Sequence, residues 1–313
     1  MPPALHADEL PIDSELVRRL VGRALPAYAD APVRRLPSSG STNVLFRLGS
    51  ELLVRLPRQP GGSQTISKEA AWLPLLGPSL PVAVPEVVAV LDPDCGYPER
   101  WSVVRWIEGT HPEVVGPGTA VDPRREVLAT DLATFLEALR RVEVPPRAVD
   151  DPHVWSYRGD PLATMDRATR ENIERCRSLD GFDLDLDAVE QVWLEAMRLP
   201  EAGRPTPCWY HGDLAAENLL VRDGALSAVL DFGGLSVGDP TVDLVVAWEV
   251  LDPAARELFR RQLGVDDASW LRGRAWALSI TLMIWYYWST MPERRARCLA
   301  VGRNVLADAG YPV

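Results

Sequence analysis

The sequence predicts an α+β protein with two lobes, a small antiparallel β-rich N-terminal lobe and a larger helical C-terminal lobe. Two observations predict this division. Short extended segments bounded by glycine, serine and proline occupy most of the chain from residue 33 to residue 105. Beyond about residue 110, apolar residues recur at helical spacing instead. We therefore expect one lobe over residues 1–108 and the other over residues 109–313.

The N-terminal lobe is expected to begin with a helix within residues 1–30. Apolar residues such as Leu16 and Leu20 recur at helical spacing there, and Asp13 or Ser14 is placed to cap the helix. An antiparallel meander should follow, with a second helix before its last two strands. The expected strands cover residues 33–36, 44–48, 52–56, 87–91 and 101–105, and the expected helix covers residues 67–76.

The C-terminal lobe is expected to begin with a helix capped by Asp122, with Pro123 in its first turn. Asp187 and Glu190 have the spacing of a capping box before another helix. The apolar stripe of the first helix should contain Val127, Leu128, Leu132, Phe135, Leu136 and Leu139. The remaining helices are expected near residues 161–178, 192–199, 241–251, 253–263 and 267–290.

The charge of the chain limits its partners. The 313 residues include 44 acidic and 33 basic side chains, which gives a net charge of −11. A general nucleic-acid-binding protein needs a basic surface, so we do not expect nucleic acid as a partner. An acidic chain suits a cationic small molecule, and it suits solubility alone equally well.

Cysteine usage and hydropathy indicate the compartment. The four cysteines are far apart and form no C-x-x-C pair, so neither a zinc site nor a disulfide framework is expected. The N-terminus has no apolar signal core, and the apolar run over residues 276–288 is too short to span a membrane. We therefore expect a cytoplasmic protein without a membrane partner, and the oligomeric state stays open.

One segment carries most of the chemistry. His211, Asp213 and Asn218 have the spacing H-x-D-x-x-x-x-N, and a D-F-G sequence begins at Asp231. Between them, Asp223-Gly224 predicts a tight hairpin that would bring Asn218 and Asp231 together. In phosphoryl transfer, the first acid orients and deprotonates an attacking hydroxyl. The amide and the second acid hold Mg²⁺ on the nucleotide phosphates, so we predict Asp213 as the base and Asn218 and Asp231 as metal ligands.

At these residues the chain resembles the aminoglycoside phosphotransferase family, small-molecule kinases with a protein-kinase-like two-lobed fold. The resemblance implies transfer of a phosphoryl group from ATP or GTP to a hydroxyl of a small molecule, and an aminoglycoside-like antibiotic is one candidate, with antibiotic resistance as the outcome. The strongest likeness lies in residues 209–214, 218–221, 229–233, 237–240 and 243–244. A weaker likeness extends through residues 38–41, 54–57, 68–70 and 106–109.

The nucleotide side of such a site is expected in the N-terminal lobe. A lysine on the third strand normally contacts the phosphates and pairs with a glutamate of the next helix. Here the third strand offers Arg55 and the helix offers Glu69, while the only lysine, Lys68, is on the helix. We therefore predict that Arg55 contacts the phosphates. The other predicted nucleotide-binding residues are Ser39, Gly40 and Ser41 in the first hairpin turn, and Trp106 and Ile107 at the hinge.

Two further residues are expected to support the loop. His211 should pack inward and bond the backbone, and Asp243 should accept backbone N–H bonds from the catalytic loop. A protein kinase is disfavoured, because no A-P-E segment follows the D-F-G sequence. A nucleotide-binding pseudokinase-like module is also disfavoured, because all three central polar residues are present.

The acceptor is left open between classes. Acids between residues 160 and 187 could line a site for a cationic acceptor, although solvated helix faces and caps explain most of them equally well. The aromatic group Trp285, Tyr286, Tyr287 and Trp288 could instead wall a pocket for a macrolide-like or other apolar acceptor, although helix core is an alternative for these side chains. Another small metabolite is the third possibility.

Overall fold

The computed structural model describes residues 6, 8–37, 42–200 and 205–312. The chain forms two compact units. The first, called the β unit here, contains residues 1–78, 83–108 and 229–233. The second, called the helical unit, contains residues 79–82, 109–228 and 234–313. The short segment 229–233, which includes Asp231, thus belongs to the β unit, whereas the sequence placed it in the C-terminal lobe.

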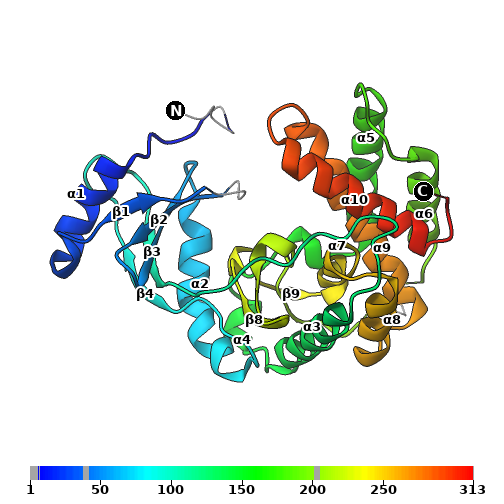
Figure 1. Ribbon diagram of the computed structural model, residues 1–313, viewed down its shortest axis with the longest axis horizontal. Coiled ribbons are helices and arrows are strands. Elements are labelled where there is room, and N and C mark those ends of the chain that lie inside the picture. The colour runs from blue at the N-terminus through cyan, green and yellow to red at the C-terminus, as the bar shows by residue number, and fades with distance from the viewer. Residues whose placement is uncertain (1–5, 7, 38–41, 201–204, 313) are drawn as a thin grey trace. The chain divides into compact units, whose positions relative to one another are not determined.

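The β unit is built on a five-stranded antiparallel sheet in the order β1-β2-β3-β5-β4 (Figure 1). Its strands are β1 (Val33–Arg35), β2 (Asn43–Leu48), β3 (Leu52–Pro57), β4 (Val87–Leu91) and β5 (Trp101–Arg105). In the centre of the sheet, Arg55 of β3 lies opposite Leu45 on one side and Ser102 on the other. The five strands lie where alternation and turn residues predicted them, within two residues at every end.

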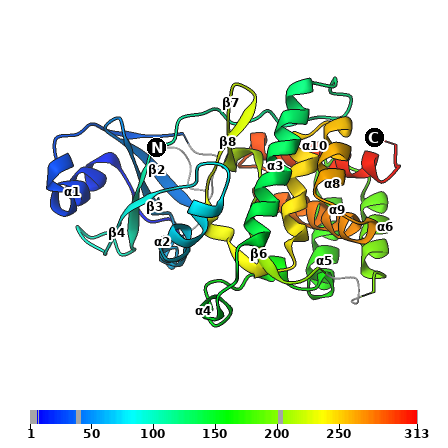
Figure 2. The same ribbon diagram turned by 90° about the horizontal axis from the view of Figure 1, so that it is seen from below.

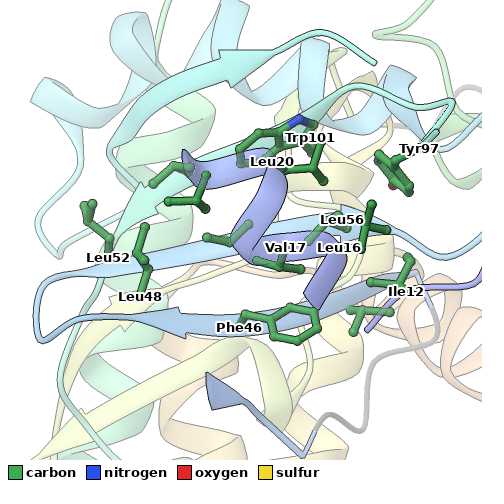
Figure 3. Packing of buried hydrophobic residues seen from close by; sticks show 14 residues of the cluster. Ile12, Leu16, Val17, Leu20, Phe46, Leu48, Leu52, Leu56, Tyr97 and Trp101 are labelled. Atoms are coloured by element: carbon green, nitrogen blue, oxygen red, sulfur yellow. The ribbon is translucent and has the colours of Figure 1, made fainter. Parts of the chain in front are cut away.

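Helix α1 (Ser14–Ala24) closes the core of this unit. Asp13 caps it by accepting a hydrogen bond of 2.8 Å from the backbone N–H of Leu16, as predicted. Figure 3 shows Leu16, Val17 and Leu20 of α1 over the sheet, together with Phe46 and Trp101. These side chains bury the sheet face that the strand alternation makes apolar, which is the main stabilisation of the unit.

Helix α2 (Ser63–Leu76) begins four residues earlier than the sequence predicted. Glu99, remote in sequence, accepts hydrogen bonds from the backbone N–H groups of Gly61 (2.9 Å) and Ser63 (3.2 Å). These bonds satisfy amides at the helix start that have no partner within the helix. The local sequence contains no such cap, so the true start could not be found from it.

The helical unit contains the remaining helices (Figure 2). Helix α9 is central and contacts α5, α6 and α10, while α3 packs on α8. Val127 of α3 is 48% exposed, so its predicted place in the apolar stripe is wrong, whereas the other five predicted members are buried. The bounds are α3 (Pro123–Arg141), α4 (Pro146–Val149), α5 (Asp166–Arg177), α6 (Leu186–Met197), α7 (Val246–Val250), α8 (Pro253–Gln262), α9 (Asp267–Leu282) and α10 (Pro292–Asp308).

Two further predictions for this unit need correction, and one helix was not predicted. The capping box at Asp187 is wrong, because Asp185 caps α6 through the N–H groups of Asp187 and Ala188, both at 3.0 Å. The side chain of Asp187 binds Arg177 instead, at 2.6 Å. Helix α9 ends at Leu282 and continues as a 3-10 turn (Met283–Tyr287). Helix α10 was not predicted, although Pro292 occupies its first turn.

Two small sheets complete the helical unit. One pairs β6 (Cys208–Tyr210) with β9 (Ser236–Gly238), and the other pairs β7 (Leu219–Arg222) with β8 (Ala225–Val229). Asp223 and Gly224 join β7 to β8 with positive φ angles of 54° and 84°. This confirms the predicted hairpin, since a tight turn of this kind requires φ > 0 at both central residues. Among the described residues, no helix is long and apolar enough to cross a membrane.

Candidate active site

The catalytic-type loop follows strand β6 in the helical unit. Both carboxylate oxygens of the buried Asp243 accept hydrogen bonds from consecutive backbone amides, those of His211 and Gly212, each at 2.8 Å. His211 is itself buried, and its Nδ1 accepts a bond of 3.2 Å from the backbone N–H of Asp213. The contacts predicted for both residues are therefore present. The loop is held from behind, and its acid is directed outward.

Gly212 must be glycine for the loop to turn. Its φ is +82°, and a Cβ there would lie 2.4 Å from the carbonyl oxygen of Gly234. A side chain would therefore be strained and would also collide with backbone. The close approach of Gly212 to Gly234 fixes the backbone immediately before Asp213.

Asn218 presents its amide in a defined orientation. Its Nδ2 donates a hydrogen bond of 2.8 Å to the carbonyl oxygen of Asp213. Because a carbonyl only accepts, the nitrogen must face it, and Oδ1 of Asn218 points the other way. That oxygen is the atom a metal ion would use. The side chain of Asp213 is 48% exposed and accessible to a ligand.

The loop contains an ion pair that the sequence did not predict. Nη1 of Arg158 lies 2.9 Å from Oδ1 of Asp213 and also donates to the carbonyl oxygen of Gly212. Arg158 lies on a 3-10 turn (Tyr157–Gly159), 55 residues before the acid in sequence. Burial works against the charge of Asp213, but Arg158, with smaller contributions from His211 and Arg294, outweighs it and lowers the pKa of the Asp213 carboxyl. The acid is therefore ionised at neutral pH.

A second group of polar residues lies in the β unit. Nη2 of Arg55 lies 3.3 Å from Oε1 of Glu69 and 3.6 Å from Oδ1 of Asp231. Arg55 and Glu69 are buried, whereas the side chain of Asp231 is 38% exposed. The predicted pairing of Arg55 with Glu69 across strand β3 and helix α2 is thus present. Asp231 has φ of +55° and accepts a bond from the N–H of Gly233, so its carboxylate is presented by a constrained turn.

The two partners of this buried pair respond differently to their surroundings. Burial raises the pKa of Glu69 despite the neighbouring guanidinium. Burial opposes the charge of Arg55 as well, but Glu69 and Asp231 outweigh it, so the pKa of Arg55 is raised. We take the pair as ionised, because a guanidinium keeps its proton and a neutral Glu69 would leave it without its closest counter-charge.

The positions of the other predicted nucleotide-binding residues say less about nucleotide binding. Ser39, Gly40 and Ser41 lie outside the described residues. The guanidinium of Arg47 stacks 3.8 Å above the ring of Trp106, whose backbone N–H bonds the carbonyl of Glu51 at 2.8 Å. Both the ring and the backbone amide of Trp106 therefore make contacts within the β unit. Lys68 is buried on α2 and is not on the strand.

Most acids between residues 160 and 187 are bound by neighbours within the helical unit. Asp166 pairs with Arg170 at 3.0 Å and also accepts a bond from Trp193. One member of the predicted aromatic group also has contacts within the unit. Trp285 donates a hydrogen bond to Asn172, and its ring stacks against the guanidinium of Arg175. The remaining ion pairs join Glu171 to Arg167, Glu174 to Arg177 and Asp183 to Arg303. These contacts support the explanation that the acids are local helix and surface features.

Comparison with known proteins identifies the family. The phosphotransferase enzyme family matches residues 33–276 of the chain. The chain belongs to this family. It is also 32% identical over 152 residues to an aminoglycoside 3′-phosphotransferase of Escherichia coli, a match that covers 46% of this chain and 51% of the relative. The chain therefore matches about half the length of that curated relative. The family resemblance found in the sequence is confirmed.

Solved structures agree on the fold. The GDP and kanamycin complex of APH(2″)-IIia superposes with a TM-score of 0.69 and 21% identity, covering 94% of this chain and 98% of that one. Macrolide 2′-phosphotransferase MphH from Brachybacterium faecium superposes with a TM-score of 0.60 and 21% identity, covering 93% and 98%. This similarity confirms the predicted protein-kinase-like α+β fold.

Proposed function

We propose that this family member is an O-phosphotransferase that moves the γ-phosphoryl group of ATP or GTP to a hydroxyl of a small molecule. The observation that carries the proposal is the loop around Asp213. Its half-exposed carboxylate is held by Arg158, and Asp243 holds the backbone of the two preceding residues, His211 and Gly212. An ionised acid with a fixed orientation suits the role of orienting a bound hydroxyl and accepting its proton as the transition state forms.

The residues present fit a magnesium ion. Asn218 turns an amide oxygen away from its own loop, and Asp231 offers an exposed carboxylate. Mg²⁺ prefers oxygen ligands and is usually held by one or two protein groups together with nucleotide phosphates. We propose that Asn218 and Asp231 hold it, where it would neutralise charge on the β- and γ-phosphates.

On the nucleotide side, Arg55 is proposed to contact the phosphates from strand β3. Glu69 fixes its guanidinium, and Nη2 of that guanidinium also lies 3.6 Å from Oδ1 of Asp231. The base of ATP or GTP would bind the backbone near Trp106 and Ile107, and Ser39, Gly40 and Ser41 are proposed to contact the phosphates. The lone Lys68 has no part in this proposal.

The proposed reaction transfers one group between two oxygens. The acceptor oxygen bonds to the γ-phosphorus, the bond from that phosphorus to the β–γ bridging oxygen breaks, and ADP or GDP leaves. The hydroxyl proton goes to the carboxylate of Asp213. Most of the rate acceleration in phosphoryl transfer comes from positioning the reactants and neutralising charge. The main contribution of this protein would therefore be a loop that is rigidly supported.

The acceptor is proposed to be a hydroxylated antibiotic, since the relative from Escherichia coli acts on aminoglycosides and a structural neighbour acts on macrolides. Resistance to that antibiotic would follow, with a cytoplasmic location where nucleoside triphosphates are available. An uncharged acceptor is favoured over a polycation, because most acids between residues 160 and 187 are already paired with arginines.

A transfer assay tests the proposal. The purified protein would be incubated with Mg²⁺, γ-labelled ATP or GTP, and a panel of aminoglycosides, macrolides and simple hydroxylated metabolites. We expect label in at least one acceptor with wild-type protein, and transfer slower by orders of magnitude with Asp213→Asn. Nucleotide binding without transfer to any acceptor or to water would instead indicate a pseudokinase-like module.

A further inference from the structure

We propose that Arg158 is a positioning residue that holds Oδ1 of Asp213, so that Oδ2 is the oxygen that receives the acceptor proton. This inference rests on the proposed function, because it assigns a role within the same reaction. It adds a residue from outside the catalytic loop, and it assigns different roles to the two oxygens of one carboxylate.

The contacts of Asp213 distinguish its oxygens. Oδ1 lies 2.9 Å from Nη1 of Arg158, within good hydrogen-bond distance. Oδ2 lies 3.4 Å from Nδ2 of Asn218, a long contact, and that nitrogen already donates to the carbonyl of Asp213 at 2.8 Å. One oxygen is therefore committed to a charged donor, and the other keeps its lone pairs for a ligand.

Arg158 also ties the carboxylate to the backbone of the loop. The same Nη1 that binds Asp213 donates to the carbonyl oxygen of Gly212. Side chain and backbone of the loop are thereby held by one group, which restricts rotation of the Asp213 side chain. A guanidinium suits this task, because it keeps its proton in proteins and cannot compete with the carboxylate as a base.

The turn that carries Arg158 is itself fixed to the core of the helical unit. Tyr210 of β6 donates a hydrogen bond of 3.3 Å to the carbonyl of Ser156, and the N–H of Asp239 bonds the carbonyl of Gly159 at 3.1 Å. A Cβ at Gly159 would lie 2.7 Å from the ring of Tyr210. The Arg158 backbone therefore has little freedom, and its reach to Asp213 is set by the fold.

The phenolic oxygen of Tyr157 completes this support. It lies 3.3 Å from Nε of Arg158, and the ring of Tyr157 packs near Trp276 of α9 at 6.4 Å between centroids. The guanidinium is thus anchored at Nε and directed at Asp213 through Nη1. Side chains whose own positions are fixed by packing and hydrogen bonds are those that hold reactive groups accurately.

Kinetics of three variants test the proposal. Arg158→Met removes the contact, Arg158→Lys keeps a charge without the fork, and Arg170→Met removes a surface ion pair of α5 as the matched control. We expect Arg158→Met to lower kcat by about 30- to 100-fold, as a small misplacement of a reacting group does. Arg158→Lys should recover part of that loss, and KM for the nucleotide should change little in either. A kcat for Arg158→Met within about twofold of the Arg170→Met value would overturn the proposal.

Crystal structures give a readout that does not depend on activity. In Arg158→Met the carboxylate of Asp213 should leave its wild-type position, whereas in Arg170→Met it should not move. An unmoved Asp213 carboxylate in Arg158→Met would also overturn the proposal. If wild-type protein phosphorylated nothing while this movement occurred, the proposed function would fail and the positioning by Arg158 would stand.

Discussion

Nε of Arg297 lies 3.5 Å from Oε1 of the buried Glu249, and the same guanidinium donates a bond of 3.0 Å to Glu217 of the catalytic loop. Helix α10, which carries Arg297, is thereby tied to both α7 and the loop. Burial raises the pKa of Glu249 to about 7, and Arg297 opposes that rise. One arginine thus neutralises two acids close to Asp213.

The first prediction follows from the pKa of Glu249. Because its folded-state pKa lies above the ordinary value of 4.5, the folded protein binds an extra proton between these values. The stability contributed by the protonated form is therefore lost as pH rises through about 7. Arg297→Met should raise the pKa of Glu249 further and destabilise the fold more at pH 8.5 than at pH 5.5. At the higher pH the loss should approach about 3–5 kcal/mol, as for a buried charge that loses its partner.

Chemical denaturation at the two pH values measures this difference. Arg303→Met is the control, because Arg303 pairs with the exposed Asp183 at the other end of α10. Its effect should be small and nearly independent of pH. An Arg297→Met loss of equal size at both pH values would show that Glu249 does not respond to that partner.

The second prediction compares the two basic residues of the nucleotide side. Arg55 contacts both Glu69 and Asp231, whereas Lys68 lies next in sequence to Glu69 on the helix. We expect Arg55→Met to weaken ATP and GTP binding by about tenfold or more, which is roughly 1.4 kcal/mol, and Lys68→Met to be mild. Isothermal titration with Mg-nucleotide measures both.

Arg55→Met also leaves Glu69 buried without its ion-pair partner, so the variant could unfold. Arg55→Lys avoids this, because it keeps a positive charge beside Glu69 while losing the two-pronged geometry. It should fold and bind nucleotide with intermediate affinity. If Lys68→Met were the more damaging change, the phosphate contact would come from the helix rather than from the strand.

The third prediction concerns the base. Asp213→Asn should lower kcat by about two to four orders of magnitude, the usual contribution of a positioned general base. The contacts of Asp243 to the loop backbone do not involve the Asp213 side chain, so the fold and Mg-nucleotide binding should be largely retained. Steady-state transfer rates and nucleotide titration measure the two quantities. Near-normal transfer in this variant would exclude Asp213 as the base.

The fourth prediction separates metal binding from proton transfer. Asp231→Asn keeps the size of the side chain and removes a negative charge that Mg²⁺ requires. We expect its Mg-nucleotide affinity to fall by about tenfold or more, roughly 1.4 kcal/mol, whereas affinity for the nucleotide without metal should change little or rise. Titrations with and without Mg²⁺ in both Asp213→Asn and Asp231→Asn measure this. Equal metal dependence in the two variants would remove Asp231 from the set of ligands.

Local chemistry explains why much of this molecule could be predicted. The hairpin at Asp223-Gly224, the cap at Asp13 and the alternation of the five strands all depend on neighbouring residues, and the structure confirms them. The spacing from His211 to Asn218 identified the loop, because its polar residues lie within eight consecutive positions of the chain. The contacts of Asp243 were also predicted, because residues 243–244 belong to the strongest likeness to the family.

The features that were missed depend on contacts between distant residues. Arg158 contacts Asp213 although 55 positions separate them in sequence. The residues around Arg158 show only an arginine followed by a glycine in an acidic stretch, which does not predict this contact. Glu99 starts α2 from 36 positions away. The cap of α6 was misplaced by two residues because Asp185 and Asp187 are equally good candidates locally. Only the folded structure shows that the side chain of Asp187 accepts a hydrogen bond from Arg177.

The last prediction concerns the acceptor, and it follows from the pairing of acids in the helical unit with arginines. Exposed charge attraction weakens with salt, since the screening length falls from about 30 Å at 0.01 M to about 8 Å at 0.15 M. Unpaired acids would attract a polyamine strongly at low salt, but Asp166, Glu174 and Asp183 are each bound to an arginine. We therefore expect the acceptor KM to change by less than about threefold between these salt concentrations, because each solvated pair that remains contributes only about 0.2–1 kcal/mol.

The salt series should be run with one aminoglycoside and one macrolide, and the nucleotide kept saturating so that donor binding does not contribute. A variant that frees an acid, Arg177→Met, serves as the control, because releasing Asp187 should make the binding of an amine more salt-dependent if the acceptor passes near it. A steep loss of aminoglycoside affinity with salt in the wild-type protein would contradict the expectation. It would show that acids other than the paired ones bind the acceptor, and it would make a polycation the natural substrate without affecting the phosphotransferase assignment.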